Sequence, residues 1–254
     1  MRLLTLAKRL SIITGLYRPT RWLSRQLRPG RLHAFQRDIK LFRSLLPSGA
    51  LCFDVGANIG QKSEALLDAG ARVVAFEPNP LVLPELRARC RHRKNWSVVA
   101  TALGSGPAIA ILHVRKSLGQ SSLIEDWEGE PLATYNVPVV TLDSAIQRFG
   151  IPFFCKIDVE GWELEVLNGL TQPIPLLSFE FHLNERDITK TAACLKKLAQ
   201  FGPSRVNITL AEASSFHLET WMPLKEFRAG FPGDLDRTQP RCHYGNIFVR
   251  NDAV

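Results

Sequence analysis

Acidic residues lie at the ends of two apolar stretches of this chain, in a pattern that suits a ligand containing a ribose. The first stretch, Leu51–Gly60, begins as a short apolar run typical of a buried parallel strand, carries Asp54 near its end and then enters a glycine turn at Gly56. The second apolar strand, Arg72–Pro78, also ends in an acid, Glu77. A carboxylate at the end of the second strand can accept hydrogen bonds from both ribose hydroxyls. The two strands therefore predict a nucleoside-containing cofactor.

The spacing of the glycine turn narrows the kind of cofactor. Gly56 and Gly60 form G-x-x-x-G, and not the G-x-G-x-x-G of dinucleotide-binding dehydrogenases. A pyrophosphate needs a tight turn that delivers backbone N–H groups to a helix N-terminus. A sulfonium cofactor has an amino-acid tail and no phosphate, so a looser turn with an acid such as Asp54 suits it. A glycine that only allows close strand–helix packing is the alternative for this turn, and Glu77 weighs against it.

Charged residues alternate at the end of another apolar strand, within Phe154–Gly161. On a strand, Lys156, Asp158 and Glu160 point to the same side. Three charges on one face of a buried strand are costly unless they are paired or lie at the open carboxyl end, where ligands bind in such sheets. A Lys–carboxylate network that caps the following helix is the alternative, and the two roles are compatible.

A further apolar strand, Leu176–His182, ends in the polar residues Glu180 and His182. A carboxylate or imidazole there could take a proton from an acceptor hydroxyl, and a purely structural pair fits the sequence equally well. The remaining histidines show no metal-ligand spacing, so we predict no metal site. The tryptophans, Trp127 among them, are expected to pack in the protein rather than to form a sugar platform.

Strand and helix patterns alternate from residue 51 onward, which predicts a mainly parallel sheet with helices on both faces. The predicted strands are 51–55, 72–77, 96–102, 153–158 and 175–181, and the predicted helices are 61–69, 80–91, 143–149, 161–168 and 187–201.

An insertion at 104–142 separates the third and fourth parallel strands. It contains two further predicted strands, 109–114 and 137–142, and a polar connection between them. A long irregular loop at this place predicts a lid or an acceptor wall. The last two strands, 205–210 and 246–250, are expected to pair antiparallel. The segment between them has no readable pattern, and we expect it to shape an acceptor pocket together with the insertion.

Positive charge is concentrated at the N-terminus. The net charge is +8, and residues 1–37 contain nine Lys or Arg and no acid, so the rest of the chain carries −1. Residues 1–17 predict a basic amphipathic helix that either lies on an anionic membrane or packs on the domain, and they are too short and too interrupted to span a bilayer. They also lack the features of a secretory signal. A second amphipathic helix is predicted at 33–46.

Composition argues against two kinds of protein, a nucleic-acid-binding protein and a disulfide-rich secreted protein. No basic stripe occurs beyond residue 37, which argues against a nucleic-acid partner for the core domain. The five cysteines are scattered, odd in number and without a C-x-x-C pair, so we expect a reducing compartment and no disulfide framework.

Four motifs together resemble the FkbM family of S-adenosylmethionine-dependent methyltransferases. They are Phe53–Gly60, Ala75–Pro80, Thr141–Asp143, and Lys156–Gly161 with Glu163 and Leu167. Their order and spacing match from about residue 50 to about 182, with weaker support from Tyr244–Asn246. The resemblance implies a class I methyltransferase (Rossmann-like) α/β fold over residues 48–254. Such a fold has a mostly parallel seven-stranded sheet, helices on both faces and an antiparallel last strand. Residues 1–47 form a basic helical extension outside the resemblance.

The resemblance also implies S-adenosylmethionine as cofactor and methyl transfer to oxygen, mostly to hydroxyls of sugars, glycans or other small metabolites. The predicted cofactor site has the glycine turn on the methionine and sulfonium side and Glu77 on the ribose. Its residues are Asp54, Gly56, Ala57, Asn58, Gly60, Glu77 and Pro78. We expect a cytoplasmic enzyme with a small-molecule or glycan acceptor, and residues 1–37 as the candidate for a peripheral contact with the inner membrane face.

Four residues are predicted to serve the chemistry. Asp158 is the first choice for the base because it ends the fourth parallel strand, and Glu160 or His182 could replace it in that role. Lys156 would steer the Asp158 carboxylate or an acidic acceptor. Two other functions compete with this one. They are a dinucleotide-dependent oxidoreductase on a Rossmann-like sheet and a noncatalytic membrane-surface binding protein.

Overall fold

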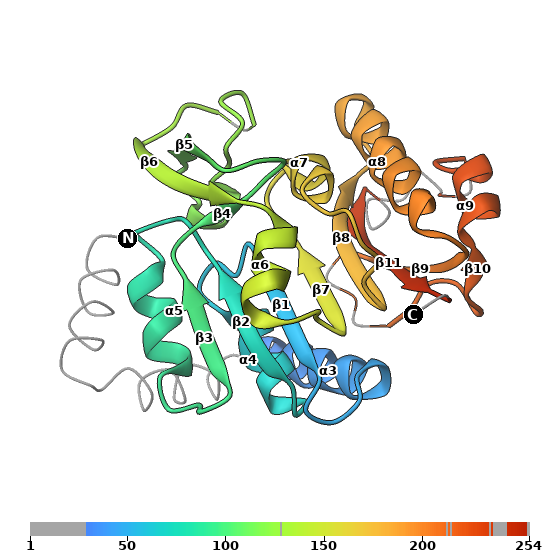
Figure 1. The fold of residues 1–254 in the computed structure, drawn as a ribbon, viewed down its shortest axis with the longest axis horizontal. Coiled ribbons are helices and arrows are strands. Elements are labelled where there is room, and N and C mark those ends of the chain that lie inside the picture. The colour runs from blue at the N-terminus through green and yellow to red at the C-terminus, as the bar shows by residue number, and fades with distance from the viewer. Residues whose placement is uncertain are drawn as a thin grey trace.

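A computed structural model describes residues 29–127, 129–211, 213, 215–233, 235 and 243–252. A central sheet has helices on both faces, and a small second sheet lies beyond the ends of its strands (Figure 1). The amphipathic helix predicted at 1–17 lies outside the described residues.

The helices and strands follow the predicted alternation. The strands are β1 (Leu51–Val55), β2 (Arg72–Phe76), β3 (Trp96–Val99), β4 (Ala102–Leu103), β5 (Ala108–Val114), β6 (Ala133–Val140), β7 (Phe154–Ile157), β8 (Leu176–His182), β9 (Ser204–Leu210), β10 (Met222–Pro223) and β11 (Tyr244–Asn251). The α-helices are α3 (Pro29–Leu45), α4 (Gln61–Asp68), α5 (Leu83–Cys90), α6 (Leu142–Phe149), α7 (Glu163–Asn168), α8 (Glu185–Leu198) and α9 (Leu224–Gly230), and short 3-10 turns are η1 (Leu118–Gln120) and η2 (Ala199–Phe201).

The strand order of the main sheet is β10-β9-β11-β8-β7-β1-β2-β3. The five strands from β3 to β8 are parallel, and β11 runs antiparallel between β8 and β9. The predicted fold class is therefore confirmed, including the antiparallel last strand. The sheet has eight strands rather than seven because the two-residue β10 adds an edge to β9. A strand that short leaves no apolar pattern in the sequence.

The third predicted strand, 96–102, is divided between the two sheets. Its first part is β3, whereas β4 pairs with β6 in the small sheet β4-β6-β5. Thr101 lies at the transition, where its hydroxyl donates to the carbonyl of Pro138 at 2.7 Å. Strands β5 and β6 of the insertion thus form a compact three-stranded unit with β4, and this unit sits over the ends of β1, β2 and β7 (Figure 1).

Two hydrophobic layers cover the faces of the main sheet. The larger layer lies under α6, α7 and α8, and the other lies under α3 and α4. Phe42 of α3 is 4% exposed, and its ring lies 5.8 Å from that of Phe154 on β7. This helix therefore belongs to the core, although it falls within the predicted extension. The domain boundary at residue 47 stays a prediction.

Two sequence expectations concern the environment of the chain. Among the described residues, none of the helices combines the length and apolar character needed to cross a bilayer. Four cysteines, Cys52, Cys90, Cys155 and Cys194, are buried as free thiols. Cys242 lies outside the described residues.

Candidate active site

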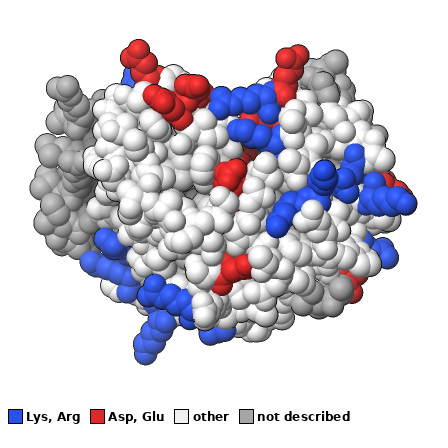
Figure 2. Space-filling view, turned by 45° about the horizontal axis from the view of Figure 1, so that its top comes forward, with Lys and Arg blue, Asp and Glu red and all other residues white. Residues whose placement is uncertain are grey.

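The carboxyl ends of β1, β2 and β7 open into a cavity of about 370 Å³ beneath the small sheet. Acidic and basic side chains gather around a hollow on this side of the molecule (Figure 2). The lining comes from the strand ends and from the insertion. It consists of Val55, Gly56, Asn58, Phe76, Glu77, Pro78, Thr101, Ala102, Leu103, Leu112, Ser117, Gly119, Gln120, Ser121, Ser122, Leu123, Asp158, Val159, Glu160 and Trp162.

The glycine turn brings β1 against the end of β7. Gly56 has φ 78°, and a Cβ on it would lie 1.8 Å from the carbonyl oxygen of Asp158. Gly60 begins α4 with φ 79°, where a Cβ would lie 2.5 Å from Leu86. Only glycine adopts this backbone without strain and leaves room for such a close approach. Gly56 therefore allows the turn to pack against β7 at the edge of the cavity, and Gly60 allows α4 to pack against Leu86.

Glu77 is a buried residue that borders the cavity. Its two carboxylate oxygens accept hydrogen bonds from the backbone N–H groups of Asn58 and Asn79, each at 2.7 Å. Burial raises the pKa of Glu77 to about 7, against the lowering effect of these two hydrogen bonds. The carboxylate is thus fixed in one orientation and retains lone pairs toward the cavity, as the binding of a ribose requires.

Lys156 holds two carboxylates behind the glycine turn. Its ammonium lies 2.9 Å from Asp158 Oδ2 and 3.6 Å from Asp54 Oδ1. Burial would lower the pKa of Lys156, but the two carboxylates raise it well above its usual value. Burial likewise opposes ionisation of Asp158, and Lys156 nevertheless lowers the pKa of that carboxyl. Asp158 is therefore a carboxylate at neutral pH.

Three carboxyl groups crowd together next to this pair. One oxygen from each of Asp158, Glu160 and Glu180 lies within 4.8 Å of the others. Burial, followed by the charges of Glu180 and Asp158, raises the pKa of Glu160 to about 8. Burial and the charge of Asp158 raise the pKa of Glu180 well above its usual value. The two glutamates therefore share the cluster with Asp158 mainly as neutral acids. One divalent cation could also contact all three oxygens at that spacing, although the sequence predicted no metal site.

Glu160 reaches the cluster by a turn and not by strand alternation. Strand β7 ends at Ile157, and Glu160 has φ 54°, a left-handed conformation that costs a non-glycine residue energy. The prediction that Lys156, Asp158 and Glu160 share one strand face is therefore correct only for the first two. A strained residue at a cavity is typical of a functional site.

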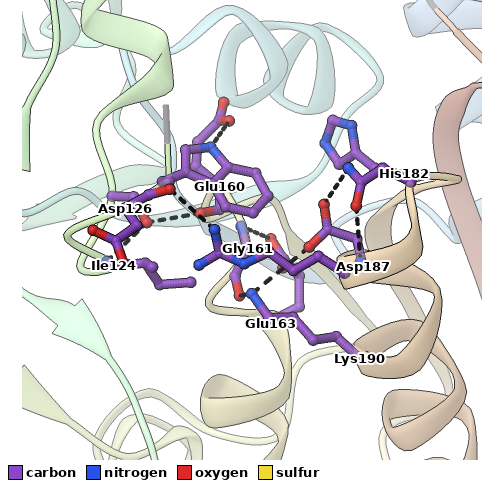
Figure 3. A network of polar contacts seen from close by, with 12 residues as sticks. Ile124, Asp126, Glu160, Gly161, Glu163, His182, Asp187 and Lys190 are labelled. Carbon is purple, nitrogen blue, oxygen red and sulfur yellow. Dashed lines mark hydrogen bonds and ion pairs between the residues drawn. The ribbon is translucent and has the colours of Figure 1, made fainter. Parts of the chain in front are cut away.

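Trp127 joins the insertion to this turn. Its indole Nε1 donates to Glu160 Oε2 at 3.0 Å, and its ring packs against Gly161, where a Cβ would lie 2.1 Å from the ring. The ammonium of Lys190 on α8 lies 5.3 Å from the same ring and donates to the carbonyl of Gly161 at 3.2 Å. In Figure 3, Gly161 lies between Glu160 and Lys190. The tryptophan predicted only to pack thus also positions Glu160.

Replacing Trp127 by Phe is expected to raise the pKa of Glu160 further and to lower turnover. Phe keeps an aromatic ring against Gly161 and removes only the N–H that stabilises the Glu160 carboxylate. Carbon-13 NMR titration of the Glu160 carboxyl measures the first effect. Trp221→Phe is the matched control because Trp221 packs on Phe216 and not against Glu160. An unchanged Glu160 titration in Trp127→Phe would contradict the assignment.

The rest of the insertion covers the cavity as a lid formed by residues 117–127. Buried Arg115 donates to the backbone carbonyls of Ile124, Glu125 and Gly129 and so holds one end of this loop. The amide of Asn79 donates to Ser121 Oγ at 3.3 Å and links the loop to the end of β2. The predicted lid therefore faces the first cavity, and no sequence signal singled out Arg115.

Glu163 organises the turn between β7 and α7. Its Oε1 accepts from the backbone N–H groups of Val159 at 3.0 Å and Gly161 at 3.2 Å. Burial raises the pKa of Glu163 from 4.5 to about 7, although these hydrogen bonds lower it. A carboxyl whose pKa is higher in the folded than in the unfolded state stabilises folding at low pH. That contribution is lost as the pH rises between the two values.

Glu163→Gln is therefore expected to match the stability of wild type below about pH 5 and to become more stable than wild type toward about pH 8. The amide oxygen of Gln can keep both hydrogen bonds and does not ionise. Thermal unfolding across this pH range measures the difference, and Glu185→Gln, at an exposed position, controls for the loss of one carboxylate. Parallel stability curves for Glu163→Gln and wild type would contradict the prediction.

The predicted site residues fall into two groups. Those that border the first cavity are Gly56, Asn58, Glu77, Pro78, Asp158 and Glu160, and those that do not are Asp54, Ala57, Gly60, Lys156 and His182. In the second group, fully buried Asp54 accepts from Ser63 Oγ at 2.5 Å, Ala57 packs in a small core cluster, and His182 Nε2 lies 3.3 Å from Glu180 Oε2. The individual roles assigned to both groups stay predictions.

The strand order, with a cavity at the carboxyl ends of the parallel strands, is that of the class I methyltransferase fold. The profile described as Methyltransferase FkbM domain matches residues 54–231, so the chain belongs to this family. Hexuronic acid methyltransferase AglP of Haloferax volcanii is 26% identical over 177 residues, which cover 63% of this chain and 68% of that protein.

Solved methyltransferase structures also resemble the chain. Precorrin-6y C5,15-methyltransferase from Geobacter metallireducens has a TM-score of 0.46 at 12% identity, covering 85% of this chain and 88% of that one. Fibrillarin from Aeropyrum pernix, in complex with S-adenosyl-L-methionine, has a TM-score of 0.41 at 12% identity, covering 80% and 66%.

The cofactor of this methyltransferase is S-adenosylmethionine, and the first cavity fits it. Gly56 lets the β1 turn meet the β7 turn at the edge of the cavity, Glu77 offers a ribose ligand, and the volume is that of a small-molecule site. When bound, this cofactor supplies an electrophilic methyl group on a positively charged sulfur. The family assignment replaces the two competing functions, the oxidoreductase and the noncatalytic membrane protein.

Proposed function

We propose that this methyltransferase methylates a hydroxyl oxygen of a sugar, a glycan or a similarly hydroxylated small metabolite. The observation that carries the proposal is the contact between the Asp158 carboxyl, which borders the cofactor cavity, and the Lys156 ammonium at 2.9 Å. The relative whose name specifies a hexuronic acid supports a sugar acceptor.

A hydroxyl acceptor needs a base, and Asp158 can act as one. The hydroxyl becomes strongly acidic only as its oxygen bonds to the methyl carbon, so a carboxylate of low pKa is basic enough to take the proton. Lys156 keeps that carboxylate oriented and unprotonated before the reaction. Glu160 and His182 are the alternative bases, and the lid contributes by excluding water from the cavity.

The acidic cluster favours a hydroxyl over a carboxylate as the acceptor. A sugar acid offers both kinds of oxygen, and a carboxylate would need no base. The Asp158 carboxylate lies within 4.8 Å of Glu160 and Glu180, whose raised pKa values show that further negative charge is unfavourable at this place. An acceptor carboxylate would be repelled there, whereas a neutral hydroxyl can donate a hydrogen bond to Asp158.

The test combines product chemistry with cofactor binding. The protein is incubated with labelled S-adenosylmethionine and a panel of neutral and acidic glycosides, and the labelled products are treated with mild alkali. Methyl ethers survive this treatment and methyl esters are cleaved, so we expect an alkali-stable label. Calorimetry should show binding of S-adenosylhomocysteine. An alkali-labile product would assign the reaction to a carboxylate and overturn the proposal.

We also propose a peripheral membrane contact through the basic N-terminal segment, which lies mostly outside the described residues. The proposal rests on the nine positive charges within residues 1–37. Because α3 begins at Pro29 and packs in the core, the truncation that tests it should remove only residues 1–28. The truncated chain is expected to lose binding to anionic vesicles and to show no change with neutral vesicles. Equal binding of the full and truncated chains to anionic vesicles would contradict the proposal.

A further inference from the structure

A second cavity, of about 80 Å³, lies at the carboxyl edge of the sheet on the side of α3 and α4. Neighbouring strands bring polar side chains to it in register, since Asn246 of β11 pairs with both Glu180 of β8 and Thr209 of β9. On β7 and β8, Lys156 likewise pairs with Ser178. The result is a row of polar groups on a sheet face that is otherwise apolar.

Asp158 is the one residue of the described chain that borders both cavities. A methyltransferase must bring its donor and its acceptor to the same place, and the group that takes the proton must reach the acceptor oxygen. We propose that the second cavity binds the reacting end of the acceptor, and that this end is a neutral hydroxylated group. This inference rests on the proposed function, and it adds where the acceptor binds and that its reacting end is uncharged.

The charges in the second cavity are balanced. Lys62 lies 2.8 Å from Asp38 of α3, and Lys156 lies 2.9 Å from Asp158. These two pairs cancel, and Glu180 is the remaining ionisable carboxyl. The net charge of the described lining is therefore zero or negative. An anionic acceptor group would find no surplus cation there and would meet a carboxylate at the reacting end.

The neutral polar lining supplies what a hydroxylated group needs. Ser178, Thr209 and Asn246 offer hydrogen-bond donors and acceptors without charge. The inner wall is apolar, with the rings of Phe154 and Phe248 stacked at 6.2 Å between centroids. Hydroxyl edges together with carbon–hydrogen faces are the two surfaces that a sugar ring presents.

The size of the cavity limits what enters it. Sites that enclose whole drug-sized ligands measure about 300–1,000 Å³, so about 80 Å³ accepts only one end of an acceptor. The rest of the acceptor would extend outward past the exposed residue Ala213 and the half-exposed Lys62. A bulky side chain at Ala213 would therefore block entry without disturbing the core.

The experiment measures binding of two probes to the full chain saturated with S-adenosylhomocysteine. The probes are methyl β-D-glucopyranoside and methyl β-D-glucopyranosiduronic acid, which share a ring and differ in charge. We expect the neutral probe to bind at least about tenfold more tightly. Ala213→Trp should weaken its binding by about tenfold or more and leave the Kd of S-adenosylhomocysteine unchanged. Ala108→Trp, the same change at an exposed position on β5, should affect neither.

A second variant probes the inner lining. Thr209→Val keeps the shape of this buried side chain and removes its hydroxyl, so the neutral probe should bind about threefold to tenfold more weakly. The inference is overturned if neither probe binds, if the acidic probe binds as tightly as the neutral one, or if both variants bind like wild type. S-adenosylhomocysteine binding and the alkali-stable product test the proposed function separately. A failure of the inference about the second cavity can therefore be distinguished from a failure of the proposed function.

Discussion

Asp158→Asn is expected to lower kcat for methyl transfer by about 10²–10⁴-fold, the usual contribution of a positioned base. Asn has nearly the shape of Asp, but its amide cannot accept the hydroxyl proton. Lys156 would keep its contact with Asp54 at 3.6 Å, so the surrounding network should survive. The affinity for S-adenosylhomocysteine should change little, because that product carries no sulfonium charge. Steady-state kinetics and calorimetry measure the two quantities.

Asp126→Asn provides the matched control for this substitution. Asp126 lies on the lid, its side chain is exposed, and it is the backbone carbonyl that accepts from Arg186 at 3.0 Å. The same chemical change there should leave kcat near the wild-type value. Full turnover by Asp158→Asn would exclude Asp158 as the base and transfer the role to Glu160 or His182.

Gly56→Ala is expected to disrupt the cofactor site and the position of Asp158 together. The added Cβ would lie 1.8 Å from the Asp158 carbonyl oxygen, so the β1 and β7 turns must separate. The left-handed backbone at φ 78° adds about 1–2 kcal/mol of strain, and overpacking of this kind adds about 1–3 kcal/mol. These costs should divide between a lower free energy of unfolding and weaker S-adenosylhomocysteine binding. Thermal unfolding and calorimetry measure them.

Gly106→Ala is the control for adding a methyl group to a glycine. A Cβ at Gly106 would meet no atom within 4 Å, so stability and binding should both match wild type. If Gly56→Ala also kept the native melting temperature and binding constant, then the close approach of the two turns would not be required for the site.

Local patterns in the sequence determined most of the fold and the first cavity. Apolar runs that end in Gly56 and Glu77 predicted two parallel strands with a ligand at their carboxyl ends, and both residues border the cavity. Such patterns are readable because a parallel strand buried on both faces is apolar throughout, and because a left-handed turn requires glycine. For the same reason the two-residue β10 and the division of residues 96–102 between two sheets left no signal.

Only the tertiary structure decided how the charged groups combine. Glu160 and Glu180 lie on separate elements and converge on Asp158, and the resulting shifts in pKa depend on burial that no sequence pattern encodes. Trp127 reaches Glu160 from the insertion, which brings the lid to the β7 turn.

The sequence alone therefore determined most of the strands and the kind of cofactor that they hold, because both follow from neighbouring residues. The tertiary structure decided which acid stays ionised and where a second cavity opens. Lys156 selects Asp158 through a short contact, and α3, β9 and β11 complete the second cavity from distant parts of the chain. These properties arise from distances across the folded protein, and the spacing of residues along the chain does not fix such distances.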